Sequence, residues 1–244
     1  MVIIPARLES SRLARKVLCD IGGLPMVVRT ALQASKIDEV VVACDDSEIM
    51  DICKRYKIAC VMTDKTHTSG TDRCAQAANK LGLNDEEIVI NLQADEPFIE
   101  TEVLESLRDL SAVSSAFINT LAKVIAPNEI SDVNLVKVLL NINNEAIYFS
   151  RLGIPYSRDG LDSQLIRENP YLGHLGLYGF RKANLDEFCS LKKSPLEHIE
   201  KLEQLRALYH NKTIAIKVVE TKSVGIDTMD DLQKAREAFV QFGL

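Results

Sequence analysis

A basic loop follows the first apolar run of the chain, residues 2–4. Its cationic side chains are Arg7, Arg12, Arg15 and Lys16. Guanidinium and ammonium groups neutralise phosphate oxygens and donate hydrogen bonds to them, so the loop is a candidate polyphosphate site. The loop matches neither the GxxxxGK[ST] nor the GxGxxG glycine-rich pattern, which leaves much of the neutralisation to side chains. The alternative interpretation is a basic loop that is simply solvated.

Two aspartates occupy positions where a divalent metal could bind. Asp95 follows the apolar run 87–92 (EIVINL), and Asp227 directly precedes Thr228, the expected cap of the last helix. Nucleotidyl transfer needs a divalent cation to offset triphosphate charge, and Mg²⁺ typically takes only one or two protein carboxylates. The pair would therefore suffice, although each aspartate alone is better explained as a helix cap or a solvated turn.

The histidines and cysteines show no catalytic or metal-binding spacing. The histidines are His67, His174, His198 and His210, and none belongs to an HExxH pattern. His174 stands between glycines at an expected strand start, which is compatible with a pocket wall. The six cysteines contain no CxxC pair and mostly lie in or beside apolar runs, so we expect reduced core residues. Covalent hydrolase chemistry therefore has no support.

Alternating strands and helices must position these groups. In the first half of the chain, short β-branched runs alternate with longer amphipathic segments. The expected strands are 2–4, 39–43, 58–62 and 87–92, and the expected helices are 25–35, 47–55, 70–81 and 101–110. Ser47 and Thr101 are the expected caps of the second and fourth of these helices. The alternation predicts an α/β fold with a mostly parallel sheet, helices on both faces, and ligands at the carboxyl ends of the strands.

Beyond residue 112 the pattern changes to consecutive strands with polar turns, which favours antiparallel pairing. The expected elements are strands at 117–125, 134–141 and 145–151, an irregular segment at 155–172, a strand at 174–180, helices at 182–190 and 195–209, a strand at 213–219 and a final helix from residue 228. The chain shows no internal repeat and no long linker. We therefore predict one domain, 1–244, with an inserted lobe at about 112–172.

Length and charge narrow the class of protein. A chain of 244 residues can bury a substantial core without disulfides or metals. It carries 29 Lys and Arg against 35 Asp and Glu, and the net charge of −6 argues against nucleic acid or an anionic membrane as a partner. The apolar run at the N-terminus is too short for a signal peptide, and no stretch approaches the ~18 apolar residues of a membrane span. We expect a soluble, cytoplasmic protein.

Nine short motifs are distributed from end to end of the chain. They are IIPARLESSRLARKVL (3–18), LPMVVR (24–29), VVACDD (41–46), TSGTDR (68–73), NLQADEP (91–97), YFSRLGIP (148–155), GHLGLYGFR (173–181), PLEHIEKLEQLR (195–206) and GIDTMDDL (225–232). Together they resemble the motifs of one family, the 3-deoxy-D-manno-octulosonate (Kdo) cytidylyltransferases, also called CMP-Kdo synthetases. The first motifs are shared loosely with other sugar nucleotidyltransferases, whereas YFSR, GHLGLYGFR and EKLEQLR are particular to the Kdo enzymes.

The resemblance implies a reaction, a fold and an assembly. The anomeric hydroxyl of Kdo would attack the α-phosphorus of CTP, with Mg²⁺, to give CMP-Kdo and pyrophosphate for lipopolysaccharide biosynthesis. The fold would be a Rossmann-like nucleotidyltransferase fold with a mixed, mostly parallel central sheet and a small antiparallel dimerisation lobe, and family members are homodimers. Such a transfer requires in-line placement and charge neutralisation rather than a protein nucleophile, in agreement with the cations and carboxylates in this sequence.

The resemblance also implies roles for individual positions. The triphosphate would be held by Arg7, Ser10, Arg12 and Lys16. The nucleotide pocket would include Ser69, Gly70, Thr71, Arg73 and Gln93. The catalytic residues would be Lys16, Arg12, Asp95 and Asp227. The two aspartates would be Mg²⁺ ligands, and Lys16 would neutralise the charge that develops as pyrophosphate leaves. The sugar acid would face Arg151, His174, Tyr178, Glu203 and Gln204, with Arg151 on its carboxylate.

Two positions depart from the usual family pattern. Ala14-Arg15 replaces the Pro-Gly that usually precedes the loop lysine, and Ala94 replaces the glycine of QGDEP. A glycine permits a close approach of the backbone to phosphate. Arg15 must therefore either point away from the phosphates or replace a backbone contact with its side chain.

Three alternative functions compete with this reading. The first is activation of a related acid sugar, such as 8-amino-Kdo or a nonulosonate like sialic acid. The second is a non-catalytic nucleotide-sugar binding module, against which the presence of Asp95, Asp227 and Lys16 speaks. The third is an NAD-binding oxidoreductase, which lacks support because the chain has no GxGxxG motif.

Overall fold

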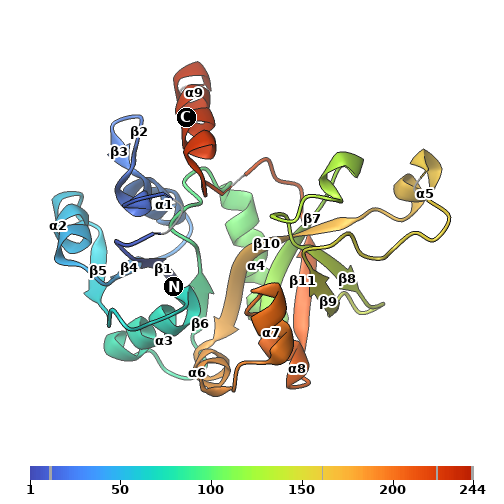
Figure 1. Ribbon diagram of the computed structural model, residues 1–244. Helices are drawn as coiled ribbons and strands as arrows, with labels where there is room; N and C mark the ends of the chain where they lie inside the picture. Colours follow the sequence, from blue (N-terminus) through green and yellow to red (C-terminus); the bar gives the residue numbers. More distant parts are fainter. Residues whose placement is uncertain (11–12, 161, 224, 243–244) are drawn as a thin grey trace.

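A central sheet contains nine strands in the described part of the chain. The computed structural model describes residues 1–10, 13–160, 162–223 and 225–242 (Figure 1). Along its main path the strand order is β11-β7-β10-β6-β1-β4-β5, and β8 and β9 extend it from β10. These strands are β1 (Val2–Ala6), β4 (Val40–Cys44), β5 (Ala59–Met62), β6 (Ile88–Asn91), β7 (Ile118–Val124), β8 (Lys137–Leu140), β9 (Ala146–Ser150), β10 (Leu172–Arg181) and β11 (Ile214–Val218). β2 (Asp20–Ile21) and β3 (Leu24–Pro25) form a separate hairpin.

Four strands form the parallel half of the sheet. β1 pairs in parallel with both β4 and β6, and β5 continues the sheet beyond β4. The runs VIIPA of β1 and VVVAC of β4 are buried at almost every position. Strands covered on both faces need continuous apolar runs, which is why their sequences predict them well. The carboxyl ends of these strands meet at one edge of the sheet.

β10 makes the sheet a mixed one. It runs antiparallel to β6 on one side and to β7 on the other, and β11 then adds to β7 in parallel. The register of β10 shifts between Leu175 and Tyr178, and such bulges bend a strand and redirect its side chains. The rings of His174 and Tyr178 lie 5.6 Å apart on this strand. The predicted mixed α/β sheet is confirmed.

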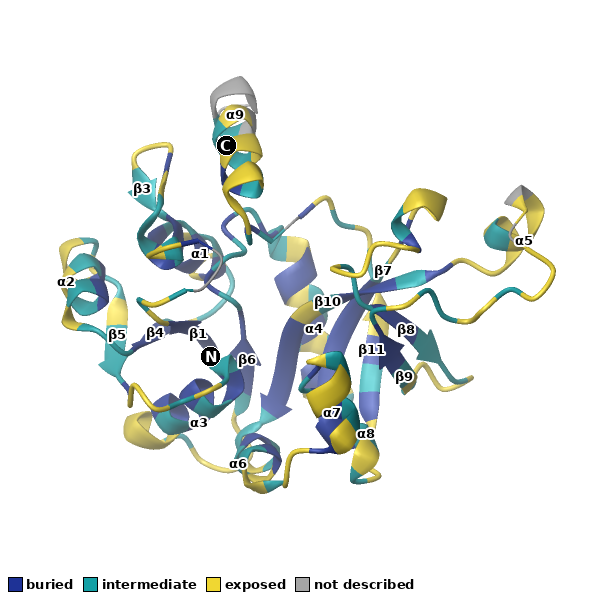
Figure 2. Cartoon of the chain, in the orientation of Figure 1, coloured by how far each residue is buried: buried dark blue, intermediate teal, exposed yellow. Residues whose placement is uncertain are grey.

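Helices cover both faces of the sheet, as predicted. The helices are α1 (Met26–Ala34), α2 (Ser47–Arg55), α3 (Gly70–Leu81), α4 (Thr101–Val113), α5 (Ser163–Glu168), α6 (Lys182–Ser190), α7 (Pro195–Glu200), α8 (Leu205–Tyr209) and α9 (Met229–Phe242), with 3-10 turns η1 (Lys16–Leu18) and η2 (Pro127–Glu129). α1, α2 and α4 share one apolar core with the sheet, and α3, α6 and α8 share the other. Figure 2 shows the sheet as the buried centre between these layers.

The single helix predicted over 195–209 is wrong, because two short helices occupy this span. α7 ends at Glu200 and α8 begins at Leu205. Between them Lys201 has a left-handed backbone with φ 56°, which the interior of an α-helix excludes. The apolar spacing continues across the break, so periodicity does not reveal it. The break has a consequence for the site, since the turn that follows buries Gln204 to 2% exposure.

Two predicted helix caps are also wrong. α2 is capped by Asp46 rather than Ser47, because Asp46 Oδ1 accepts the backbone N–H of Glu48 at 2.9 Å. The helix therefore begins one residue earlier than a Ser47 cap requires, and Ser47 is its first helical residue. α4 has Glu100 at its cap position with no capping bond from the side chain, and Thr101 is already helical. The Glu100 carboxylate is directed to another segment of the chain instead.

The span predicted as an inserted lobe, about 112–172, contributes to both the sheet and its periphery. β7 lies inside the main sheet between β10 and β11, while β8 and β9 form an antiparallel extension. The stretch 155–172, predicted to be irregular, contains α5, which lies at the opposite end of the molecule from α2 (Figure 1). The domain 1–244 and the dimerisation and sugar-binding roles of the lobe stay predictions. Within the described ranges, every helix is too short or too polar to span a membrane.

Candidate active site

A cavity of about 300 Å³ opens at the carboxyl ends of β1 and β6. Its walls come from the basic loop after β1, the loop after β6, the start of α3 and the segment before α9. It gathers most residues predicted to bind nucleotide and metal, namely Arg7, Ser10, Lys16, Ser69, Gly70, Arg73, Gln93, Asp95 and Asp227. Arg12, predicted to act with them, lies outside the described residues. Ligands of open α/β sheets bind at this edge, so the cavity is the candidate active site.

The Lys16 ammonium lies between the two predicted metal-binding aspartates. Its Nζ donates a hydrogen bond to Asp227 Oδ1 at 2.9 Å and another to Asp95 Oδ2. Burial favours the neutral amine, but the two carboxylates outweigh burial and raise the pKa of Lys16 above its ordinary value. The site therefore places an ammonium group between two carboxylates, which favour its charged form.

The two aspartates suit a magnesium ion that is shared with a phosphate ligand. Among the described residues, no group of three or more His, Cys, Asp or Glu side chains is placed to hold a metal ion. Mg²⁺ keeps several water or phosphate oxygens and typically takes one or two carboxylates, so this donor set fits it. The side chains of Asp95 and Asp227 are 21% and 40% exposed, which leaves oxygen atoms accessible to an incoming ion. The arrangement fits a metal that arrives with the nucleotide.

Arg73 supports the cavity through a buried ion pair. Its Nη2 lies 3.1 Å from Asp45 Oδ2, and its Nη1 donates to Thr63 Oγ1 at 2.6 Å. The second oxygen of Asp45 accepts the backbone N–H of Leu8 at 3.0 Å, so the pair ties α3 and the end of β4 to the basic loop. Sequence reasoning missed Asp45 as a site residue. The available signal was its place directly after an apolar strand, in VVACDD.

The first turn of α3 faces the cavity. The Ser69 hydroxyl caps it by accepting the backbone N–H of Asp72 at 3.1 Å. Gly70 permits close packing, since a Cβ there would lie 3.0 Å from Pro5 Cγ and 3.3 Å from Gln93 Oε1. α3 has 12 residues, and the N–H groups and dipole at its N-terminus favour negative charge. A phosphate group in the cavity would meet this positive end.

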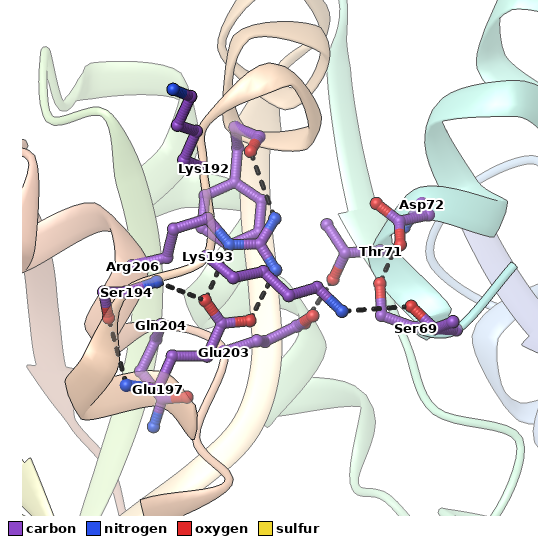
Figure 3. A network of polar contacts seen from close by, with 12 residues as sticks. Ser69, Thr71, Asp72, Lys192, Lys193, Ser194, Glu197, Glu203, Gln204 and Arg206 are labelled. Atoms are coloured by element: carbon purple, nitrogen blue, oxygen red, sulfur yellow. Dashed lines mark hydrogen bonds and ion pairs between the residues drawn. The ribbon is translucent and has the colours of Figure 1, made fainter. Parts of the chain in front are cut away.

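A chain of hydrogen bonds leads from the cavity to the turn between α7 and α8. Gln93 Nε2 donates to Asn91 Oδ1 at 3.0 Å, and Asn91 Nδ2 donates to Thr71 Oγ1 at 3.2 Å. The Thr71 hydroxyl then donates to Glu203 Oε1. Figure 3 shows Thr71 on α3 beside Glu203. The chain connects residues predicted for the nucleotide with residues predicted for the sugar through Asn91, which sequence reasoning missed.

Gln204 is buried and Glu203 is half-buried, and each has one buried side-chain atom with unused hydrogen-bonding capacity. In the part of the chain that the structure describes, Glu203 Oε2 and Gln204 Nε2 have no partner, whereas Gln204 Oε1 accepts the Tyr178 hydroxyl at 3.1 Å. Desolvation raises the pKa of Glu203 above its usual value. Leaving a buried polar atom without a partner is costly, so this acceptor and this donor indicate a place for the hydroxyl groups of a ligand.

A buried ion pair holds this turn in place (Figure 3). The Arg206 guanidinium bonds to both oxygens of Glu197, with Nη2 2.6 Å from Oε1 and Nε 2.9 Å from Oε2. It also lies over the ring of Phe188, 4.6 Å from the centroid. Bidentate arginine–carboxylate pairs fix geometry as well as charge. The pair therefore anchors α8 to α7 and orients the turn between them.

His174 is buried among aromatic rings. Its Nε2 lies 2.9 Å from Thr120 Oγ1, and its ring packs edge-on against Phe149 with centroids 4.9 Å apart. Burial lowers the pKa of His174 to about 3. The imidazole is therefore neutral at neutral pH, a state that suits hydrogen bonding to sugar hydroxyls better than pairing with a carboxylate.

The neutral state of His174 should make the stability of the protein depend on pH. The imidazole has an ordinary pKa of 6.5 and a pKa of about 3 in the folded protein, so acid protonates the unfolded chain first. This contribution is present above pH 6.5 and is lost as the pH falls, by about 2 kcal/mol between pH 7 and pH 5. Urea unfolding of the wild type and of His174→Gln at both pH values measures it. Equal pH dependence in the two proteins would contradict the buried neutral histidine.

Arg151 is not among the residues that line the cavity. Its Nε donates to the carbonyl of Glu200 at 2.8 Å and its Nη1 to the carbonyl of Val133 at 3.0 Å. Its own carbonyl accepts a hydrogen bond from the buried ammonium of Lys137 at 2.6 Å. These contacts tie the end of β9 to α7 and to the loop before β8. A contact between Arg151 and a sugar carboxylate stays a prediction.

Comparison with known proteins decides the family. The family pattern described as Cytidylyltransferase matches residues 1–214. The chain belongs to the cytidylyltransferase family. A curated relative of this cytidylyltransferase, the 3-deoxy-manno-octulosonate cytidylyltransferase of Helicobacter pylori, is 55% identical over 98% of this chain and 97% of its own length. The protein of the same name from Nitratiruptor sp. is 47% identical over 99% of this chain and 100% of its own length. The resemblance predicted from the motifs is confirmed.

Solved structures share the fold of this cytidylyltransferase. A CMP:2-keto-3-deoxy-manno-octonic acid synthetase, solved in complex with CTP, matches with a TM-score of 0.88 and 36% identity over 98% of each chain. A cytidylyltransferase from Leptospira borgpetersenii matches with a TM-score of 0.63 and 16% identity over 99% of this chain and 86% of that one, a likeness of fold alone. The predicted nucleotidyltransferase fold is confirmed.

The two departures from the usual motifs leave the cavity of this cytidylyltransferase intact. The Arg15 guanidinium bonds to Glu48 on α2, and Arg15 does not line the cavity. Ala94 lines it, and the carbonyl of Ala94 accepts the hydroxyl of Thr30 at 2.9 Å. Of the two possibilities stated for Arg15, the structure supports the one in which its side chain points away.

Proposed function

We propose that this protein transfers CMP from CTP to the anomeric hydroxyl of Kdo and so activates Kdo for lipopolysaccharide biosynthesis. The observation that carries the proposal is the Lys16 ammonium beside Asp95 and Asp227 in a cavity joined by hydrogen bonds to Glu203. Relatives that match nearly the whole chain are named for this activity.

The proposed reaction forms one bond and breaks one. The anomeric oxygen of Kdo bonds to the α-phosphorus of CTP, and the bond from that phosphorus to the oxygen bridging to the β-phosphate breaks. Pyrophosphate leaves with the bonding electron pair, and the hydroxyl proton of Kdo is released. Mg²⁺, for which Asp95 and Asp227 are the proposed ligands, supplies further neutralisation of the triphosphate charge.

The chain itself would supply placement and positive charge. Arg7, Lys16 and the N-terminus of α3 surround the cavity, and together they suit a triphosphate. Lys16 stays protonated and faces the cavity, so we assign it the role of stabilising the negative charge that develops on the departing pyrophosphate. Arg12 shares this role by its position in the motif. On the acceptor side, the buried Oε2 atom of the half-buried Glu203 offers a hydrogen-bond acceptor for a sugar hydroxyl.

Replacing Glu203 separates recognition of the sugar from recognition of the nucleotide. We expect Glu203→Gln to raise the KM for Kdo about 10- to 100-fold, since a hydrogen bond to a charged group contributes about 1.5–3 kcal/mol. The KM for CTP should change less than about twofold, because Glu203 does not line the cavity and is joined to it through the Thr71 chain. Glu187→Gln, which changes an exposed carboxylate on α6, is the matched control. An unchanged KM for Kdo would remove Glu203 from the acceptor site.

We also propose that the protein works as a homodimer. Large apolar side chains are exposed along the lobe, at Val133 (53%), Ile142 (98%), Ile147 (57%), Leu152 (68%) and Tyr156 (86%). These exposed apolar side chains all lie in the span predicted to form the lobe, and a second copy is the partner that the family resemblance implies. Analytical ultracentrifugation should give twice the 27.2 kDa of one chain, and a monomer would contradict the proposal.

All six cysteines are free thiols, which suits the proposed cytoplasmic location.

Pyrophosphate release tests the proposed activity. Purified protein mixed with CTP, Kdo and Mg²⁺ should release one pyrophosphate for each CMP-Kdo formed, and excess EDTA should stop the release. Release in the absence of Kdo, or release that EDTA leaves unchanged, would contradict the transfer or the metal requirement respectively.

A further inference from the structure

The segment that carries Asp227 connects β11 to α9, and the structure describes it on both sides of position 224. It leaves the edge of the sheet at Val219, whose N–H donates to the carbonyl of Ala122 at 2.8 Å. It then passes the loop after β6, where the N–H of Ile226 donates to the carbonyl of Asp95 at 2.9 Å. Thr221, Lys222 and Ser223 form the first part of this segment. Polar residues cannot hold a segment by apolar packing, so specific hydrogen bonds must do so.

Glu100, at the start of α4, binds the first part of the segment with both carboxylate oxygens. Oε1 accepts the backbone N–H of Lys222 at 2.8 Å, and Oε2 accepts the hydroxyl of Thr221 at 2.5 Å. The Thr221 oxygen in turn accepts the N–H of Ser223 at 2.9 Å. Hydrogen bonds to a charged group are the stronger kind. The Glu100 carboxylate makes no capping hydrogen bond on its own helix, and it instead binds a segment more than a hundred residues away in the chain.

Glu96 binds the next part of the segment. Its Oε2 accepts the hydroxyl of Ser223 at 2.9 Å. Its Oε1 lies 3.0 Å from the position that a Cβ on residue 225 would occupy, so Gly225 lets the backbone lie against the carboxylate. Glu96 directly follows Asp95 in the chain. The loop that carries one proposed metal ligand therefore also binds the segment that carries the other.

The far side of Asp227 is held as well. Asp231 Oδ2 accepts the backbone N–H of Asp227 at 3.2 Å and that of Thr228 at 2.9 Å. The Thr228 hydroxyl accepts the N–H of Asp231 at 3.2 Å, which completes the cap of α9. The backbone of Asp227 is thus fixed between the segment before it and the helix after it.

We propose that Glu96 and Glu100 form a clamp that positions Asp227 opposite Asp95 for metal binding. Both are positioning residues, since they bind residues that precede Asp227 in the chain and do not line the cavity. The inference rests on the proposed role of Asp227 as a Mg²⁺ ligand. Groups that orient a metal ligand from behind typically contribute 10- to 100-fold to metal affinity. The clamp sets the separation of the two carboxylates, because Glu96 directly follows Asp95 in the loop after β6.

Variants at Thr221 and Glu100 test the clamp without touching the cavity. Thr221→Val removes the hydroxyl at nearly constant volume, Thr221→Ser retains it, and Glu100→Gln removes the charge. We expect Thr221→Val and Glu100→Gln to raise the Mg²⁺ concentration for half-maximal rate about tenfold, while the KM for Kdo stays unchanged. Thr221→Ser should restore the wild-type Mg²⁺ dependence. Glu102→Gln, which changes the neighbouring carboxylate on α4, should behave like the wild type.

Hydrogen exchange gives a readout that does not need turnover. In the clamp variants the amides of Lys222 and Ile226 should exchange faster than in the wild type, with the rest of the sheet unchanged. Unchanged Mg²⁺ dependence in both Thr221→Val and Glu100→Gln would overturn the clamp. Asp227→Asn, assayed in parallel, tests the metal role of Asp227 separately. If Asp227→Asn is inactive while the clamp variants behave like the wild type, the clamp is rejected and the proposed function is not affected.

Discussion

Asp95→Asn and Asp227→Asn are each expected to lower the rate of CMP-Kdo formation about 100- to 1000-fold, because each removes a negative charge on which the proposed Mg²⁺ site depends. Asparagine keeps the shape of the side chain and one oxygen, so the fold should persist. Steady-state rates at saturating CTP and Kdo measure the loss, and Mg²⁺ titration should show a raised half-saturation in any residual activity.

The matched control for the aspartate variants is Asp230→Asn. Asp230 is an exposed carboxylate in the first turn of α9, three positions after Asp227. Its replacement should change the rate less than about twofold, as is usual for an exposed charge. Near-normal turnover in Asp95→Asn or Asp227→Asn, with the protein folded by circular dichroism, would remove that residue from the metal site.

Lys16→Met is expected to have an effect of similar size for a different reason. The Lys16 ammonium stays charged and faces the cavity, and loss of one preorganised group for developing charge typically lowers kcat about 100- to 1000-fold. The variant also leaves Asp95 and Asp227 without the cation between them. Like charges repel, so the rise in melting temperature on adding Mg²⁺ should be larger in Lys16→Met than in the wild type.

Arg15→Ala provides the matched control for Lys16→Met. Arg15 is the adjacent cation of the same loop, but its guanidinium bonds to Glu48 outside the cavity. Exposed ion pairs contribute about 0–1 kcal/mol, so this variant should keep nearly full activity and stability. An equal loss of activity in Arg15→Ala and Lys16→Met would show that the loop acts through its total positive charge. That result would contradict the specific role assigned to Lys16.

Much of the fold could be predicted because burial shapes local sequence. The continuous apolar runs of β1 and β4 and the amphipathic pattern of α3 identify these elements, and the predicted bounds of α3, 70–81, are those observed. The break at Lys201 could not be predicted in this way. Leucines continue at helical spacing across it, and the buried Arg206–Glu197 pair that anchors the two helices is a tertiary contact. Tertiary contacts here override a local pattern.

Site residues could be predicted where a motif directly follows a strand and the order of the strands brings such motifs together. Arg7, Lys16 and Asp95 follow strands that end at one edge of the sheet, so parallel pairing brings them together. The supporting residues escaped prediction because their roles exist only through distant contacts. Glu96 meets Ser223, 127 positions away in the chain, and nothing in the local sequence of either residue indicates the pairing. Asp45, which links Arg73 to the basic loop, is a similar case.

The most direct test of the proposed function is the catalytic efficiency of CMP transfer from CTP to different acceptors, with products identified by mass spectrometry. We expect CMP-Kdo as the product, with kcat/KM for Kdo at least about 100-fold above that for N-acetylneuraminate, since an acceptor site built on hydrogen bonds discriminates strongly. UTP in place of CTP should give little product. Equal efficiency with both sugar acids, or no transfer to Kdo, would contradict the proposed function.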